Sequence, residues 1–205
     1  MILEEAIAKI KPLDHNAMEI AQKRWDSIAK PLHSLGKLET LLIQIAGITG
    51  NAEVDLSRRG LIAMCADNGV VEEGVTQTGQ EVTAIVAENF LKYDTSVGVM
   101  CKQNHAEIFP VDMGMVTDTK VRTDHKIAYG TQNMTKGPAM TREQAVKGLE
   151  AGIDMVRELN DKGYRILATG EMGIGNTTTS SAVASVLLKQ PVEEMTGRGA
   201  GLTSE

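Results

Sequence analysis

The chain has little of three things that often point to a function: aromatic side chains, cysteines and long apolar runs. Aromatic residues make up 3% of its 205 residues, and eleven methionines serve as adaptable core fillers in their place. Cys65 and Cys101 lack the CxxC spacing of redox or zinc motifs, so we expect two free, buried thiols in a reducing compartment. No apolar run approaches the roughly 20 residues that cross a bilayer, and no secretory leader pattern is visible.

The chain also lacks an excess of positive charge and any cluster of metal ligands. Its 21 Lys and Arg against 27 Asp and Glu give a net charge of −6, which argues against nucleic-acid binding. The four histidines are scattered without metal spacing, so we expect neither a metal nor a cofactor. We therefore expect a cytoplasmic protein with no membrane partner and no nucleic-acid partner.

Short apolar runs alternate with helical patterns along most of the chain. Residues 61–67, 106–114 and 164–170 are typical of strands buried in a parallel sheet, and Pro110 suggests an edge position or an early stop for the second of them. Helical patterns lie between these runs, over residues 80–103 with a break near Asp94 and over residues 141–163. Strands and helices in alternation predict an α/β fold, a parallel sheet flanked by helices.

The first fifty residues have a different pattern, with helices expected over 17–30 and 36–49. We therefore divide the chain into an N-terminal helical segment, residues 1–55, and an α/β domain, residues 56–205. In the second part, Thr141 and Gln144 predict a capping box at the start of the best helix. The apolar stripe expected along that helix consists of Ala145, Leu149, Ile153, Val156 and Leu159.

The stretch GEMGIGNTTTSS, residues 170–181, joins the third strand to a helix expected from residue 177. Gly173 and Gly175 allow a tight turn, and the start of a helix offers unpaired N–H groups that attract anions such as phosphate. The pattern is not a Walker loop, and GxGxxT misses the dinucleotide fingerprint by one residue. A helix that simply follows a glycine turn remains the alternative. The presence of Glu171 favours the interpretation with a bound ligand. A carboxylate beside a phosphate site needs another task, such as removing a proton or stabilising positive charge.

Two further stretches are polar and rich in glycine. ADNGVVEEGVTQTGQEVTA, residues 66–84, follows the first strand, and TGRGAGL, residues 196–202, ends with three alternating glycines. Because ligands of parallel sheets bind at the carboxyl ends of the strands, Asp67 is a candidate binding residue. A solvated loop is the alternative for the first stretch and a flexible tail for the second.

Five motifs together carry a resemblance to a known family. KPLHSLGKLETL, CADNGVVEEGV with QEVTA, NMTKGPAM, GEMGIGNTT and TGRGAGL occur in one order over nearly the whole chain. In these motifs the chain resembles the nicotinate-nucleotide:dimethylbenzimidazole phosphoribosyltransferases, which act in cobalamin biosynthesis. The resemblance implies a Rossmann-like, three-layer domain over residues 56–205, a small second domain that includes residues 1–55, and a homodimer. It also implies transfer of ribose 5-phosphate from nicotinate mononucleotide to 5,6-dimethylbenzimidazole or a related base, giving α-ribazole 5′-phosphate and nicotinate.

The resemblance also implies roles for single residues. Glu171 matches a functional glutamate near the reacting centre, and Thr78 and Val86 fall in the pocket for the benzimidazole. Some members have Gln at the position of Val86, so the resemblance leaves room for a different aromatic base. Asn68 replaces a usual His, at a place that we expect to lie away from the chemistry. Asp67 is expected to bind substrate, and phosphoribosyl contacts are implied for Gly173, Gly175, Asn176, Thr177, Thr178, Gly197 and Gly199.

The largest departure from the family is length. Members continue well past GRGAGL, and the glutamate named as their general base and a phosphate-binding lysine follow that point. We therefore expect the C-terminal part of the α/β domain to be absent and the chain to turn over poorly alone. A non-catalytic nucleotide-binding or regulatory subunit is the main alternative. A dinucleotide-dependent dehydrogenase is a weaker one, because it rests on the incomplete GxGxxT pattern alone.

Overall fold

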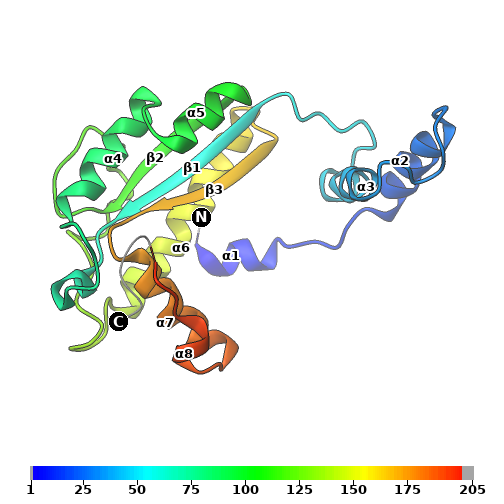
Figure 1. The fold of residues 1–205 in the computed structure, drawn as a ribbon. Coiled ribbons are helices and arrows are strands. Elements are labelled where there is room, and N and C mark those ends of the chain that lie inside the picture. Colours follow the sequence, from blue (N-terminus) through cyan, green and yellow to red (C-terminus); the bar gives the residue numbers. More distant parts are fainter. Residues whose placement is uncertain (1, 200–205) are drawn as a thin grey trace. The chain divides into compact units, whose positions relative to one another are not determined.

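The fold is taken from a computed structural model that describes residues 2–199 (Figure 1). The chain divides into two compact units, one of residues Ile2–Arg58 and one that begins at Arg59. The first consists of helices, and the second holds the sheet. No helix of the described residues is long and apolar enough to cross a membrane.

The N-terminal unit contains helices α1 (Leu3–Ala8), α2 (His15–Ser27) and α3 (Lys37–Thr49). The Asp14 carboxylate caps α2 by accepting a hydrogen bond from the Ala17 N–H at 3.0 Å, and α2 ends three residues before the position expected from the sequence. Helices α2 and α3 pack closely because Gly47 has no side chain: a Cβ there would lie 2.7 Å from the Met18 side chain.

A buried ion pair explains much of the motif KPLHSLGKLETL. Lys30 Nζ lies 2.9 Å from Glu39 Oε1, and both side chains are largely shielded from solvent. The same oxygen accepts a hydrogen bond from the Leu35 N–H at 3.0 Å. Hydrogen bonding to Lys30 and to this N–H holds the pKa of Glu39 below its usual range. The pair therefore links the segment that follows α2 to the first turn of α3.

The second unit is built on a parallel sheet of β1 (Arg59–Ala66), β2 (Ala106–Gly114) and β3 (Ile166–Met172), in the order β2-β1-β3. Of the two alternatives for the strand with Pro110, the edge position is confirmed, since β2 pairs with β1 alone in the described sheet and continues to Gly114. Because all three strands are parallel, their carboxyl ends meet at one edge. The expected parallel α/β fold is confirmed.

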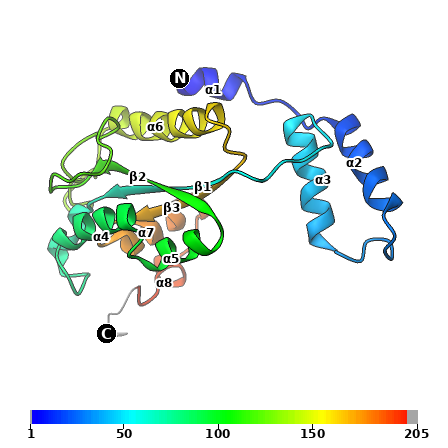
Figure 2. The ribbon, with the colours of Figure 1, turned by 90° about the horizontal axis from the view of Figure 1, so that it is seen from above.

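Helices cover both faces of this sheet (Figure 2). The break expected near Asp94 is present, between α4 (Glu81–Lys92) and α5 (Ser96–Gln103), which lie on one face. Helix α6 (Arg142–Asp161) lies on the other face, where Met155 and Leu159 pack against Ile62 and Val111 of the strands. The three expected layers are therefore present.

Helix α6 differs from the prediction in the face that it buries. Its capping box forms as expected, with Thr141 and Gln144 exchanging side-chain and backbone hydrogen bonds. Of the expected stripe, however, Leu149 and Val156 are exposed and only Leu159 is fully buried. The buried face is made by Ala151, Met155 and Leu159. The expected stripe was wrong because α6 has apolar residues on more than one face, and only one face can contact the sheet.

Three further helical elements belong to this unit. A short 3₁₀ helix, η1 (Gly69–Glu73), follows β1, and α7 (Asn176–Leu188) and α8 (Val192–Met195) follow β3.

Both cysteines are free and buried, as expected. Burial raises the pKa of the Cys65 thiol to about 12, so this residue is not a ready nucleophile.

Candidate active site

Glu171 lies at the carboxyl end of β3, on the sheet face that α6 covers. Along β3, Leu167 packs into the core beneath α6 and Met172 packs into the core on the opposite face. Alternation along the strand therefore directs Glu171 to the α6 face. Its strand partner on β1 is Met64, and its side chain is exposed to solvent. A carboxylate is thus available at the strand ends, the usual ligand position of parallel sheets.

The glycine loop, residues 173–175, leads from β3 to α7 in close contact with the end of β1. A Cβ on Gly173 would lie 2.2 Å from the Ala66 carbonyl oxygen, so no other residue fits without a shift of the backbone. Gly175 has a φ of +85°, which favours glycine, and a Cβ there would approach the Val71 side chain to 2.9 Å. Both glycines are needed for the path of the chain, whether or not a ligand binds.

Asn68 and Thr83 hold the glycine loop from outside it. The Asn68 amide donates to the Ile174 carbonyl oxygen at 3.1 Å and accepts from the Thr179 hydroxyl at 2.9 Å. The buried Thr83 hydroxyl accepts from the Ile174 N–H at 3.0 Å. The expectation that Asn68 lies away from the chemistry was wrong, because the structure places this side chain against the loop and the first turn of α7.

The first turn of α7 offers unpaired donors. Its N-cap is Gly175, which has no side chain to accept the helix N–H groups. The N–H groups of Thr177 and Thr178 lie in this first turn, where a helix has no internal acceptors, and the Thr177 side chain is exposed. The Asn176 amide donates to a Glu171 carboxylate oxygen. The first turn of α7 thus offers N–H donors of the kind that can bind an anion, directly beside a carboxylate.

The segment TGRGAGL reaches this position as far as the structure describes it. A Cβ on Gly199 would lie 3.0 Å from the Thr177 hydroxyl, whereas one on Gly197 would meet nothing within 4 Å. The last three residues of the segment fall outside the described residues. The structure therefore brings Gly199, but not Gly197, into contact with the first turn of α7.

Thr78 and Val86 lie on the α4 side of the sheet. Thr78 is exposed in the loop before α4, and Val86 is partly buried against the core on that side. Glu171 points to the other face. Thr78 and Val86 are therefore not brought together with Glu171 on one side of the sheet, although Thr83 connects α4 to the glycine loop.

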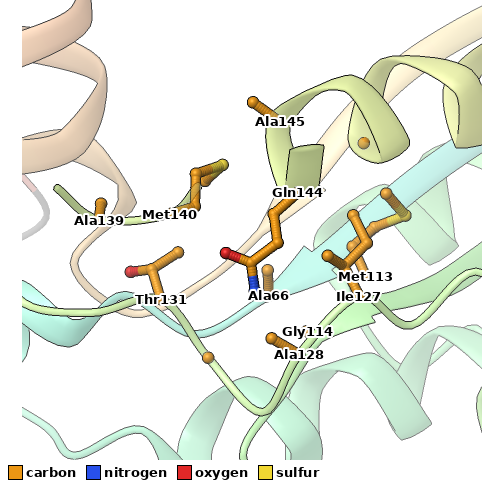
Figure 3. Close-up of a pocket in the computed structure, with 12 residues that line it drawn as sticks. Ala66, Met113, Gly114, Ile127, Ala128, Thr131, Ala139, Met140, Gln144 and Ala145 are labelled. Atoms are coloured by element: carbon orange, nitrogen blue, oxygen red, sulfur yellow. The ribbon is translucent and has the colours of Figure 1, made fainter. Parts of the chain in front are cut away.

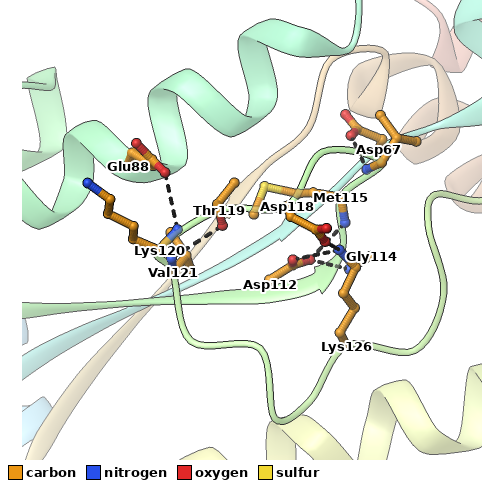
Figure 4. A network of polar contacts seen from close by, with 11 residues as sticks. Asp67, Glu88, Asp112, Gly114, Met115, Asp118, Thr119, Lys120, Val121 and Lys126 are labelled. Carbon is orange, nitrogen blue, oxygen red and sulfur yellow. Dashed lines mark hydrogen bonds and ion pairs between the residues drawn. The ribbon is translucent and has the colours of Figure 1, made fainter.

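Asp67 is fully buried directly after β1 (Figure 4). One carboxylate oxygen accepts from the Val116 N–H at 2.8 Å, and the Asp67 carbonyl oxygen accepts from the Thr131 N–H at 3.0 Å. Burial raises the pKa of Asp67, and the nearby Thr83 hydroxyl and the Val116 N–H oppose that rise. In this structure, the side chain holds the loop after β2 in position.

Asp112 forms a second buried anchor of the same loop. One of its oxygens accepts from the N–H groups of Gly114 and Met115 at 2.9 and 2.8 Å, and the other lies 3.1 Å from Lys126 Nζ (Figure 4). The two aspartates expected at the strand ends therefore fix backbone, and Glu171 alone of the three is exposed. Among the described residues, no cluster of potential metal ligands is found.

A pocket of about 200 Å³ opens on the α6 face at the same strand ends (Figure 3). Its floor comes from β1 and β2, one wall from the loop of residues 127–140, and its roof from the first turns of α6. Most of the lining is apolar, and the lining residues are Ala66, Met113, Gly114, Ile127, Ala128, Gly130, Thr131, Ala139, Met140, Gln144, Ala145 and Gly148. Sequence reasoning missed this pocket, and its one signal was the motif NMTKGPAM, which supplies part of the wall.

Known proteins are similar to the chain in sequence and in fold. A family model described as phosphoribosyltransferase matches residues 10–205. Nicotinate-nucleotide–dimethylbenzimidazole phosphoribosyltransferases from Ruminiclostridium cellulolyticum and Clostridium acetobutylicum are 50% and 49% identical to the chain. Both alignments cover the whole chain, which spans 59% of each relative.

A solved structure is also similar. The crystal structure of CobT from Thermus thermophilus superposes with a TM-score of 0.84 at 35% sequence identity, over 92% of this chain and 58% of that one. The sequence match and the shared fold both extend over nearly all of the chain. The chain therefore belongs to the nicotinate-nucleotide:dimethylbenzimidazole phosphoribosyltransferase family.

Proposed function

We propose that the chain binds nicotinate mononucleotide and serves the transfer of its ribose 5-phosphate to 5,6-dimethylbenzimidazole or a related aromatic base. The products are α-ribazole 5′-phosphate and nicotinate, in cobalamin biosynthesis. One observation supports this most: the glycine loop presents the uncapped first turn of α7 next to the exposed carboxylate of Glu171. Relatives that bear the name of this reaction align with the whole chain.

The phosphate of the donor would bind at the first turn of α7. The N–H groups and hydroxyls of Thr177 and Thr178 are donors there, and the positive end of the helix dipole favours the anion. Gly173 and Gly175 let the backbone pass close to the end of β1, which sets the position of that turn. Gly199, beside the Thr177 hydroxyl, would close the phosphoribosyl site on one side, with Gly197 next to it in the chain.

Glu171 would act on the ribose. Nicotinate leaves as a neutral pyridine from a cationic pyridinium, so positive charge develops on the anomeric carbon in the transition state. A fixed carboxylate stabilises that charge, and the Asn176 amide fixes the position of the Glu171 carboxylate. The acceptor base also loses an N–H proton. The resemblance assigns the removal of that proton to a glutamate that follows GRGAGL in the family.

Asp67, Thr78 and Val86 take different parts in this proposal. The Asp67 carboxylate is buried and bonded to protein, so we propose that it positions the loop after β2. Thr78 and Val86 remain the proposed contacts of the benzimidazole, from the α4 side. The apolar side chain at Val86 suits bases other than dimethylbenzimidazole as well.

Calorimetric titration tests the mononucleotide site. We expect nicotinate mononucleotide to bind the chain and the dinucleotide NAD not to bind. Gly173→Ala is expected to lower the affinity for the mononucleotide at least tenfold, because its Cβ would displace the loop from the Ala66 carbonyl oxygen. Gly137→Ala is the matched control, since a Cβ at Gly137 meets nothing within 4 Å. A preference for NAD, or equal affinities in the two variants, would contradict the proposal.

We also propose that the chain forms a homodimer, as the resemblance implies, and that it is cytoplasmic. Analytical ultracentrifugation tests the first: a mass twice that of one chain supports it, and the mass of a single chain contradicts it. Fractionation of cells tests the second.

A further inference from the structure

Asn68 lies between the glycine loop and the start of α4. Its side-chain amide donates to the Ile174 carbonyl oxygen at 3.1 Å and accepts from the Thr179 hydroxyl at 2.9 Å, so it contacts the glycine loop and α7 together. Its backbone carbonyl oxygen accepts from the Gln80 side chain at 3.0 Å. Because only 9% of Asn68 is exposed, these contacts with protein replace most of its contacts with water.

The glycine loop also packs directly against the Asn68 side chain. A Cβ on Gly173 would lie 2.9 Å from Asn68 Nδ2, and a Cβ on Gly175 would lie 3.5 Å from Asn68 Cβ. Gly175 is the N-cap of α7, so a displacement of Asn68 would move the start of that helix. The position of the N–H groups of Thr177 and Thr178 therefore depends on Asn68.

The start of α4 is fixed against the same residue. The N-cap of α4 is Gln80, whose side chain makes no capping hydrogen bond and bonds to the Asn68 carbonyl oxygen instead. In the first turn of α4, the buried Thr83 hydroxyl accepts from the Ile174 N–H at 3.0 Å. Helix α4 is thus joined to the glycine loop twice, by Thr83 directly and by Gln80 through Asn68.

The loop of residues 74–79 carries Thr78 and leads to Gln80. It contains neither helix nor strand, none of its residues is buried, and Thr78 is exposed. Within it, the Thr76 hydroxyl donates to the Thr78 carbonyl oxygen at 2.8 Å. Segments with little buried surface open more readily than the sheet beside them. A base that binds at Thr78 would therefore order this loop and, at its end, the side chain of Gln80.

Ordering of this loop and ordering of the glycine loop share one residue. Gln80 bonds to the backbone of Asn68, and the glycine loop bonds to its side chain. A ligand that rigidifies a protein loses conformational entropy of the protein on binding, and a second ligand that needs the same groups fixed then loses less. The gain in affinity is reciprocal, because each ligand favours the same ordered state.

We propose that Asn68 is a positioning residue that couples the two substrate sites. An aromatic base bound at Thr78 strengthens the binding of a phosphoribosyl group at the first turn of α7, and the phosphoribosyl group strengthens the binding of the base. Asn68 contacts neither ligand in this arrangement. This inference rests on the proposed function, and it adds that the site on the α4 side and the site at α7 are filled cooperatively.

Two variants and one control test the inference. Asn68→Ala removes both side-chain hydrogen bonds to the glycine loop and α7. Gln80→Met removes the link from α4 at nearly constant size and keeps the Asn68 side chain. Gln103→Met is the matched control, because it makes the same exchange at an exposed position at the end of α5. Should Asn68→Ala fail to fold, Thr179→Val replaces it, and Thr179→Ser, which keeps the hydroxyl, is then expected to behave like the wild type.

Calorimetry measures the affinity for ribose 5-phosphate with and without saturating 5,6-dimethylbenzimidazole. Ribose 5-phosphate carries no nicotinate to lose, so no transfer disturbs the titration. We expect the base to raise this affinity about fivefold in the wild type and in Gln103→Met, the lower end of typical coupling between two sites. Gln80→Met is expected to bind ribose 5-phosphate alone like the wild type and to show no gain from the base. Asn68→Ala is expected to show no gain and to bind ribose 5-phosphate alone at least fivefold more weakly.

Hydrogen exchange gives a readout that a purely structural role would not change. We expect the base to slow exchange of the Ile174 N–H in the wild type and not in Gln80→Met. Independent binding of the base and ribose 5-phosphate to the wild type, or the full gain in Gln80→Met, would overturn the inference and leave the proposed function standing. A wild type that does not bind nicotinate mononucleotide would overturn both.

Discussion

Replacing Thr83 by valine is expected to destabilise the α/β unit and to loosen the glycine loop. The side chain is fully buried, and its hydroxyl accepts from the Ile174 N–H at 3.0 Å. Valine has nearly the same shape but leaves this N–H without its acceptor. An unsatisfied buried N–H costs about 1–3 kcal/mol. We expect a loss of about 2 kcal/mol in the free energy of unfolding, a large share of the roughly 5–15 kcal/mol that stabilises a domain.

Thr83→Ser is the matched control, because it keeps the hydroxyl and removes one methyl group, worth about 1 kcal/mol. Urea unfolding followed by circular dichroism measures both variants. Trp25, the single tryptophan, lies in the N-terminal unit, so its fluorescence follows that unit separately. We also expect the valine variant, and not the serine variant, to lose affinity for nicotinate mononucleotide. A difference below about 0.5 kcal/mol between the free energies of unfolding of the two variants would refute the reasoning.

Three further predictions concern carboxylates. Glu171→Gln is expected to strengthen ribose 5-phosphate binding and weaken nicotinate mononucleotide binding, each by about 1 kcal/mol, because the carboxylate repels phosphate and attracts the pyridinium; titrations that show no change in the ratio of the two affinities would contradict this. Burial raises the pKa of Asp67, so the folded wild type gains stability relative to Asp67→Asn as the pH falls from 7 towards the ordinary value of 3.8, and parallel unfolding curves would contradict this. Lys30 lowers the pKa of Glu39, so the wild type should lose stability relative to Glu39→Gln as the pH falls below 4.5. Unfolding followed by Trp25 fluorescence measures this stability. A stability difference between the two proteins that does not change with pH would count against the ion pair.

Local patterns predicted the elements of the α/β unit well. Pro110 indicated an edge strand or an early stop, because a proline has no N–H to donate to a neighbouring strand. The capping box of Thr141 and Gln144 needs only residues three apart, so it is visible in the sequence. The buried face of α6 was not predictable in this way. Which apolar face contacts the sheet depends on the side chains that meet it, and Met155 packs there whereas Leu149 is exposed.

The candidate site was recognisable where its residues are neighbours in the sequence, and not where they lie far apart. The glycines and hydroxyls around residue 175 are contiguous, so the loop and the start of α7 were recognisable from the sequence. Asn68 was missed because its partners Ile174 and Thr179 lie more than 100 residues further along the chain. Asp67 and Glu171 both follow the pattern of a polar residue at a strand end. Only the contacts of the folded chain show that the first is buried and the second exposed.

The strand order has a consequence for how the chain folds. β1 lies in the middle of the described sheet, and Arg59 pairs with Ala106, 47 residues on, and with Ile166, 107 residues on. Closing the longer loop costs more chain entropy, so we expect β1 to pair first with β2 and β3 to be the last strand added. Amide protection of β3 before β2 in pulsed hydrogen exchange would disprove this order. The first turn of α7, the proposed anion position, then forms at the end of folding, after the layer that supports it is complete. Under the proposed function, a nascent chain cannot capture a nucleotide before its scaffold exists.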